Sequence, residues 1–116
     1  MVIEVCEQSV LTNILTDTKE EMSRIFGDSL KDVRLYGSYA RGEQTEESDI
    51  DVFVLVDKPK SVLNTFRRRI SDFSSDLDLK YGTLLSIKLQ DVETFNRFGN
   101  ALPFFQNVKM EGYSIV

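Results

Sequence analysis

The stretch Leu35–Val56 reads LYGSYARGEQTEESDIDVFVLV, and it contains the features that decide the fold. Its last seven residues, Ile50–Val56 (IDVFVLV), are rich in β-branched side chains and predict the strongest strand of the chain. Its first residues complete a shorter predicted strand, Asp32–Tyr36, in which apolar and polar side chains alternate. Gly37 and Ser38 interrupt that strand. The stretch therefore predicts two strands joined by a short connection.

Helical and strand patterns continue on both sides of this stretch, with apolar residues at helical spacing in two long segments. The further elements expected are a helix over Glu7–Phe26, a short helix at Tyr39–Arg41, a helix over Ser61–Leu79, a strand at Thr83–Leu89, short helices from Asp91 to Phe98 and from Pro103 to Gly112, and a tail or edge strand at Tyr113–Val116. This order predicts an α/β arrangement. The connection between the first two strands is too short for a crossover helix, so these strands are expected to be antiparallel or part of a mixed sheet.

Length and composition indicate one globular domain over residues 1–116. With 41% hydrophobic residues the chain can build a core without disulfides. No apolar run approaches the roughly 20 residues of a membrane span, and no signal peptide is visible, so we expect a cytoplasmic protein. The net charge of −5 argues against a general nucleic-acid-binding surface, which would be basic.

Two absences narrow the chemistry that the chain can carry. There is no His, which excludes imidazole bases and His-containing metal sites. The one Cys, Cys6, is expected to be a packed small hydrophobe and cannot form an internal disulfide. Carboxylates, hydroxyls, Lys, Arg and metals with oxygen ligands remain.

Gly37 and Ser38 form a candidate phosphate site, because a strand runs into them and a short helix follows. Gly lets the backbone approach a ligand closely, Ser offers a hydroxyl, and free N–H groups at a helix start favour an anion. Arg41 follows closely enough to reach a phosphate.

Asp49 and Asp51 form a candidate metal site at the beginning of the strongest strand. Strand side chains alternate between faces, so both carboxylates emerge on one face and repel each other. A hard divalent cation, Mg²⁺ or Mn²⁺, would relieve this repulsion and fill its shell with water and substrate phosphates. Together with Gly37 and Ser38, the pair predicts a metal–nucleotide site for phosphoryl or nucleotidyl transfer.

Each feature alone has a plainer interpretation. An Asp-x-Asp sequence is often a solvated strand end, and Gly-Ser is often a simple turn. The run Arg67-Arg68-Arg69 is interpreted first as a solvated helix face, with a contact to triphosphate or to an acidic partner as the alternative. Core packing is the first interpretation of a dense group of aromatic residues, and an exposed patch for a partner is the second. The group is Phe95, Phe98, Phe104 and Phe105.

Gly37-Ser38, ten residues, and then Asp49-Ile50-Asp51 resemble the signature of the DNA polymerase beta-like nucleotidyltransferase superfamily. The fuller text GSYARGEQTEESDIDVFVLVD resembles the minimal nucleotidyltransferases in particular. The resemblance implies a short mixed β-sheet flanked by helices, an α+β fold. It also implies that Gly37 and Ser38 hold the nucleotide triphosphate and that Asp49 and Asp51 are the catalytic metal ligands.

One departure from the family pattern concerns a third carboxylate, which members usually carry on a neighbouring strand. The predicted strand Thr83–Leu89 contains no acid, and Gly82 stands at its entrance, where similar sequences often have Asp. Asp78 is the candidate replacement if that strand begins earlier than predicted. A solvated acid at a helix end is the preferred interpretation of Asp78.

The resemblance implies a Mg²⁺-dependent nucleotidyltransferase that uses ATP and moves AMP onto a hydroxyl of a partner protein. Such domains often act as antitoxins of a helical toxin encoded nearby, and we expect no second domain for a small acceptor within these 116 residues. The alternative is a catalytically degenerate nucleotide-binding subunit that neutralises a toxin by complex formation. The sequence does not decide whether the chain forms homo-oligomers.

Overall fold

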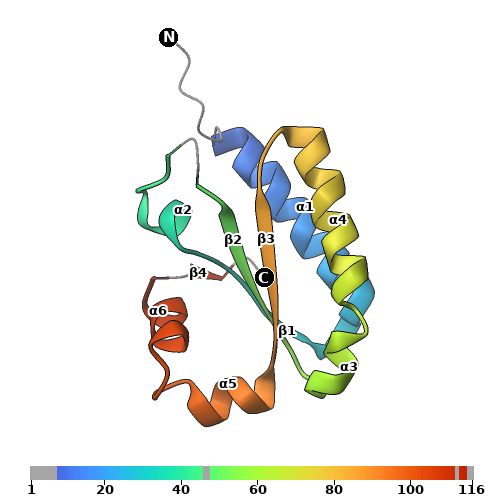
Figure 1. Cartoon of the computed structure of the whole chain (residues 1–116), viewed down its shortest axis with the longest axis vertical. Coiled ribbons are helices and arrows are strands. Elements are labelled where there is room, and N and C mark those ends of the chain that lie inside the picture. Colours follow the sequence, from blue (N-terminus) through green and yellow to red (C-terminus); the bar gives the residue numbers. More distant parts are fainter. Residues whose placement is uncertain (1–7, 46–47, 112, 115–116) are drawn as a thin grey trace.

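The computed structural model describes residues 8–45, 48–111 and 113–114, and Cys6 lies outside this part of the chain. Helices flank a sheet on both faces (Figure 1). The elements are α1 (Gln8–Phe26), the 3-10 turn η1 (Gly27–Ser29), β1 (Leu30–Tyr36), α2 (Ser38–Arg41), β2 (Ile50–Val56), α3 (Lys60–Asn64), α4 (Arg67–Tyr81), β3 (Leu85–Asp91), α5 (Val92–Phe98), α6 (Pro103–Glu111) and β4 (Tyr113–Ser114). No helix in this part of the chain has the length and apolar character needed to cross a membrane.

The four strands form a mixed sheet in the order β3-β2-β1-β4. β2 pairs with β1 in antiparallel and with β3 in parallel orientation, and β4 adds to the far side of β1. The expected fold class is therefore confirmed. Because β2 lies between two long neighbours, the strand that carries the acid pair is an internal strand of the sheet.

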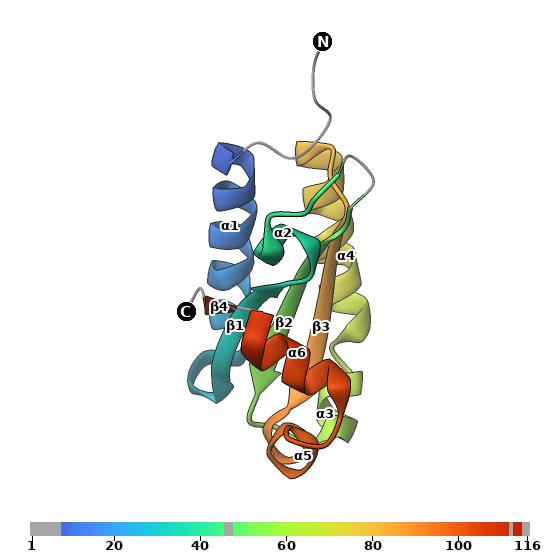
Figure 2. The same cartoon turned by 90° about the vertical axis from the view of Figure 1, so that its left-hand side faces the viewer.

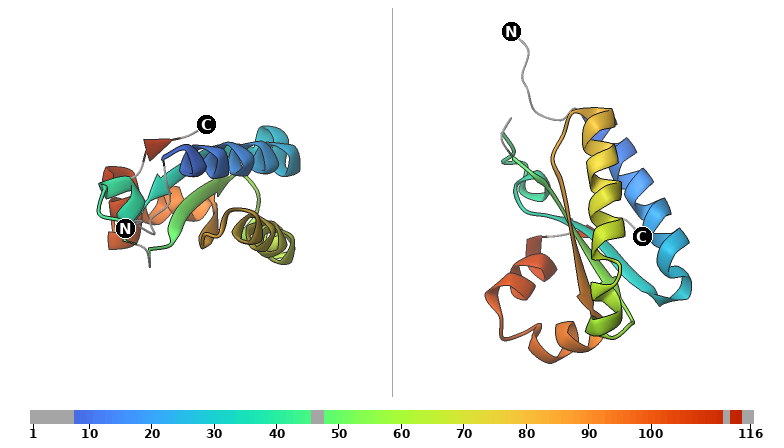
Figure 3. Two further views of the ribbon diagram at one scale, coloured as in Figure 1. Left: turned by 90° about the horizontal axis from the view of Figure 1, so that it is seen from above. Right: turned by 45° about the vertical axis from the view of Figure 1, so that its right-hand side comes forward.

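One face of the sheet packs against α1, α3 and α4, which lie together on that side (Figures 1 and 3). Val52 and Val54 point to this face and are fully buried. Ile14 and Met22 of α1 are equally inaccessible, as the helical spacing of the apolar residues predicts. This face therefore holds the larger of two hydrophobic clusters.

The opposite face has a smaller cluster, which α5 and α6 cover only in part (Figure 2). Phe53 is its centre, with its ring 5.4 Å from that of Phe95 and 6.3 Å from that of Phe105. Core packing is thus confirmed for Phe95 and Phe105, while Phe98 is 40% exposed. The part of this face near the beginning of β2 is left for the candidate site.

The predicted single helix over Ser61–Leu79 is wrong, because the segment is divided into α3 and α4. At the break, the Thr65 hydroxyl donates to the Val62 carbonyl oxygen at 2.6 Å, and the Thr65 N–H donates to the same atom. These bonds compete with a continuous α-helical ladder. Phe66 can then pack its ring edge-on against Phe26, at 5.1 Å between centroids. Periodicity alone did not indicate this local competition.

The third long strand begins at Leu85, two residues later than predicted. Gly82 ends α4 in the left-handed conformation, with φ of 68°, and its N–H donates to the Asp78 carbonyl oxygen. The helix therefore extends past its predicted end at Leu79 to Tyr81, and Thr83 and Leu84 connect its cap to β3.

Candidate functional site

Gly37 forms a sharp junction between β1 and α2. Its φ of 75° and ψ of −156° lie in a region of backbone space that is essentially restricted to glycine. Its carbonyl oxygen accepts the N–H groups of Ala40 and Arg41, both at 3.1 Å, and Ser38 begins the helical turn that these bonds close. The predicted order of strand, Gly-Ser and short helix is confirmed.

Asp51 lies directly against this junction. A Cβ atom added to Gly37 would collide with Oδ2 of Asp51 and would stand 3.3 Å from its Cγ. Only glycine leaves the Asp51 carboxylate in place, so residues fourteen positions apart in the sequence share one small volume. The structure thus brings the Gly-Ser element and the acid pair together.

The sheet register defines which side chains share the face of Asp51. Asp51 is paired with Tyr36 on β1 and with Ser86 on β3, and paired residues of neighbouring strands point to the same face. Asp49 lies one residue before β2, where its side chain is exposed. The carboxylates therefore stand at the entrance of the internal strand.

The electrostatics of the site centre on Asp51. Its pKa is raised, first because the carboxyl is partly buried and second because the negative charge of Asp49 is near, while Arg41 opposes the shift. Burial, together with the charge of Asp51, raises the pKa of Tyr36 to about 12. The positive charge of Arg41 is near enough to act on Asp51, and its Nε also donates to Glu43 Oε1 at 2.7 Å. The site therefore has excess negative charge that a cation would relieve.

The residues present fit a hard divalent cation. Carboxylate oxygens are the ligands that Mg²⁺ and Mn²⁺ prefer, and Mg²⁺ commonly takes only one or two of them. Because Gly37 has no side chain, the Asp51 carboxylate can lie directly against the backbone at the Gly-Ser junction, where a Cβ atom would overlap it. Among the described residues no group of three His, Cys, Asp or Glu side chains is placed to hold a metal. Asp49 and Asp51 would thus need water or phosphate oxygens to complete the coordination.

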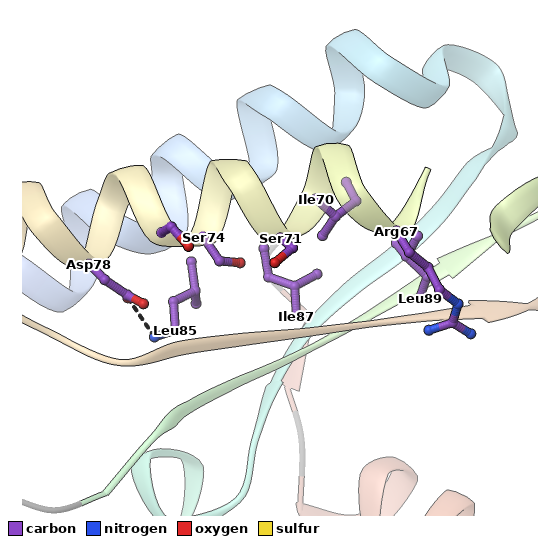
Figure 4. Close-up of a pocket in the computed structure, with 9 residues that line it drawn as sticks. Arg67, Ile70, Ser71, Ser74, Asp78, Leu85, Ile87 and Leu89 are labelled. Carbon is purple, nitrogen blue, oxygen red and sulfur yellow. Dashed lines mark hydrogen bonds between the residues drawn. The ribbon is translucent and has the colours of Figure 1, made fainter. Parts of the chain in front are cut away.

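Asp78 does not supply a third carboxylate, and that suggestion is corrected. Asp78 lies on α4, which covers the face of the sheet opposite to Asp51. Its Oδ1 accepts the Leu85 N–H at 2.7 Å (Figure 4). The side chain thus holds the beginning of β3. Gly82 is a helix cap, so it is not the equivalent position either.

The position that faces Asp51 on the neighbouring strand is Ser86, which the sequence reasoning did not single out. Its exposed side chain offers a hydroxyl where an acid would stand beside the pair. The alternation in the segment TLLSIKL does place Ser86 on one face, but the register with Asp51 depends on the folded sheet.

These features define a class of protein: a small mixed-sheet domain with a glycine junction packed on an acid pair. The nucleotidyltransferase domain family matches residues 15–105, and the chain belongs to this family. The protein named "Putative protein adenylyltransferase MJ0141" of Methanocaldococcus jannaschii is 38% identical over 76 residues, which cover 66% of this chain and 75% of that protein. "Protein adenylyltransferase MntA" of Thermococcus cleftensis is 38% identical over 53 residues, which cover 46% of this chain and 52% of that protein.

Solved structures show the same fold. A crystal structure of a mutant of the toxin-antitoxin MntA-HpeT aligns with a TM-score of 0.52 and 20% identity, over 86% of this chain and 71% of that one. A crystal structure of the toxin-antitoxin with AMP-PNP aligns with a TM-score of 0.52 and 22% identity, over the same shares of the two chains. The chain is therefore a nucleotidyltransferase by family and by fold, and its relatives are protein adenylyltransferases.

Proposed function

We propose that this chain transfers AMP from Mg²⁺-bound ATP to a hydroxyl group of a partner protein, as the antitoxin of a toxin–antitoxin pair. The observation that carries the proposal is the packing of Gly37 against the Asp51 carboxylate, with Asp49 beside it. The names of the relatives support the protein acceptor, and the toxin-antitoxin structures support a toxin as the partner. That this toxin is helical and encoded nearby is what the family resemblance implies.

In this proposal each residue has a defined task. The junction at Gly37 and Ser38 positions the phosphates, and Arg41 offsets their charge. Asp49 and Asp51 would hold the metal, which would supply positive charge against the phosphate oxygens. The acceptor oxygen forms a bond to the α-phosphorus, the bond from that phosphorus to the bridging oxygen breaks, and pyrophosphate leaves. The hydroxyl proton is released to solvent.

The test is transfer of label from α-³²P-ATP to the protein encoded beside this chain's gene. Asp49→Asn and Asp51→Asn should each abolish labelling while the thermal unfolding transition remains cooperative. Asp57→Asn is the matched control, because Asp57 is an exposed acid at the other end of the same strand. Labelling that persists in either site variant would refute the assigned roles.

A second function is supported by the absence of a third carboxylate in the described part of the chain. With Ser86 opposite Asp51, the domain would bind nucleotide and neutralise its partner by complex formation alone. Tight association without label, unchanged by Asp49→Asn, would favour this function. Ser86→Asp separates the cases further: it should raise transfer if the wild-type site lacks an acid, and should not raise it if the acceptor completes the site.

A further inference from the structure

β3 is the outermost strand on its side of the sheet, and no further strand in the described part of the chain pairs with its outer edge. The Ile50 N–H donates to the Leu84 carbonyl oxygen at 2.8 Å, so in this parallel pair the backbone groups of even-numbered β3 residues face β2. Those of Leu85, Ile87 and Leu89 face away from the sheet. The outward Leu85 N–H donates to Asp78 Oδ1. The outward N–H and C=O groups of Ile87 and Leu89 have no hydrogen-bond partner among the described residues. An open edge of this kind is a template for a further strand.

Two grooves border this edge, and both are lined in part by Arg67, Ile87 and Leu89. The first has a volume of about 280 Å³ and lies between β3 and α4, where Ser71, Ser74 and Ser75 present only small side chains (Figure 4). The second has a volume of about 520 Å³, and Ser86, Ile87 and Lys88 are among the residues that line it. Space for side chains of an added strand is therefore present along this edge.

Cationic side chains gather at these grooves although the whole chain carries a net charge of −5. Lys60, Arg67 and Lys88 line the larger groove, and Arg67 also lines the smaller one. Asp91, in the larger groove, is already engaged, because its carboxylate accepts the Thr94 N–H at 2.8 Å and a bond from Gln90. Asp78, in the smaller groove, is also engaged, because its carboxylate accepts the Leu85 N–H.

We propose that the edge of β3 docks an acidic, extended segment of the acceptor protein, which pairs with β3 as a fifth strand. This inference rests on the proposed function and names the surface by which the acceptor is recognised. Backbone bonds to Ile87 and Leu89 hold the segment at the edge, and Lys60, Arg67 and Lys88 select its charge. A residue of that segment that pairs with Ser86 lies on the same face of the sheet as Asp51, with β3 between them.

A second copy of this chain fits the edge less well. Pairing of two β3 strands would place Lys60, Arg67 and Lys88 of both copies along one seam, where like charges repel. An acidic segment meets the same three cations with opposite charge, so the distribution of charge favours a different protein as the occupant.

The experiment measures binding of a short fluorescent peptide in which glutamate alternates with valine around one tyrosine, by fluorescence anisotropy without nucleotide. We expect saturable binding, weakened about tenfold by Arg67→Glu or Lys88→Glu. Arg69→Glu is the matched control: it makes the same charge change on the same helix, at an exposed residue that lines neither groove. Ile87→Pro removes an outward N–H without removing a bond to β2, and should also weaken binding.

Several results would overturn the docking surface. They are no binding of the glutamate peptide, equal binding of the same peptide with lysine in place of glutamate, or equal loss with Arg69→Glu. A dimer in sedimentation that Arg67→Glu strengthens would assign the edge to a second copy. AMP transfer to the peptide is measured separately, so binding without transfer would contradict the proposed function and leave the docking surface standing. Should Ile87→Pro fail to fold, the charge variants still decide the outcome.

Discussion

Replacing Gly37 with alanine tests the central juxtaposition of the site, because the added methyl group meets both a backbone and a side-chain obstacle. The backbone at φ 75° and ψ −156° costs a non-glycine residue about 1–3 kcal/mol. For a chain of 116 residues, an unfolding entropy of about 2.1 cal/mol/K per residue converts this cost to a decrease of about 4–12 °C in Tm.

The second obstacle is the Asp51 carboxylate, which must move because the new Cβ would overlap Oδ2 and stand 3.3 Å from Cγ. A displacement of about 1 Å at a reacting centre can reduce the rate about 100-fold. We therefore expect Gly37→Ala to lose about two orders of magnitude in AMP transfer, measured with labelled ATP well below the melting temperature of the variant.

Gly82→Ala is the matched control for this experiment. Gly82 also has a positive φ, 68°, but a Cβ there has no atom within 4 Å, and the residue caps α4 away from the site. Its left-handed backbone costs about 1–2 kcal/mol, so its Tm should fall by a similar amount, about 4–8 °C. Full transfer by Gly37→Ala, or an equal loss by Gly82→Ala, would refute the argument that Gly37 keeps Asp51 in place.

Three further predictions concern stability. Burial and the charge of Asp49 raise the pKa of Asp51, so the protonated carboxyl is tolerated at low pH and stability is lost as the pH rises through that pKa. In EDTA, Asp51→Asn should therefore raise Tm at pH 7 and leave it unchanged at pH 3. A variant that is less stable than the wild type at pH 7 would contradict this. Burial alone would raise the pKa of Asp91, but bonds from Thr94 and Gln90 lower it below its ordinary value, so Asp91→Ala should cost about 1 kcal/mol in urea unfolding at neutral pH and progressively less below about pH 4. Phe53→Ala should cost about 3–5 kcal/mol in the same measurement, since its ring is 1% exposed at the centre of the smaller cluster; a cost below 1 kcal/mol would show that the cluster contributes little.

Local rules were sufficient for much of this fold. The β-branched residues of Ile50–Val56 predicted the strand with its bounds, and the helical spacing before Gly27 predicted α1. The Asp91 cap was also predictable, since its carboxylate bonds an N–H three residues later, as helix caps do. These features depend on residues that are near one another in the sequence.

Non-local features of the site were not predictable in the same way. The identity of the residue opposite Asp51 depends on the register between β2 and β3, and a shift of one residue would exchange Ser86 for a residue of the other face. The distance between Gly37 and Asp51 likewise follows from the pairing of Tyr36 with Asp51 across two strands. The roles of these residues in catalysis stay predictions.

The alternation in β2 also explains why loss of the site need not mean loss of the fold. Val52 and Val54 are fully buried against the helices, and each contributes about 1.5–3 kcal/mol by its burial. Asp51 points to the other face, where burial and the charge of Asp49 raise its pKa and make its ionised form less favourable than in the unfolded chain. The same strand is therefore anchored by one set of side chains and strained by the other. A cation or an amide in place of the charge should each relieve the strain, but only the cation can keep the site active.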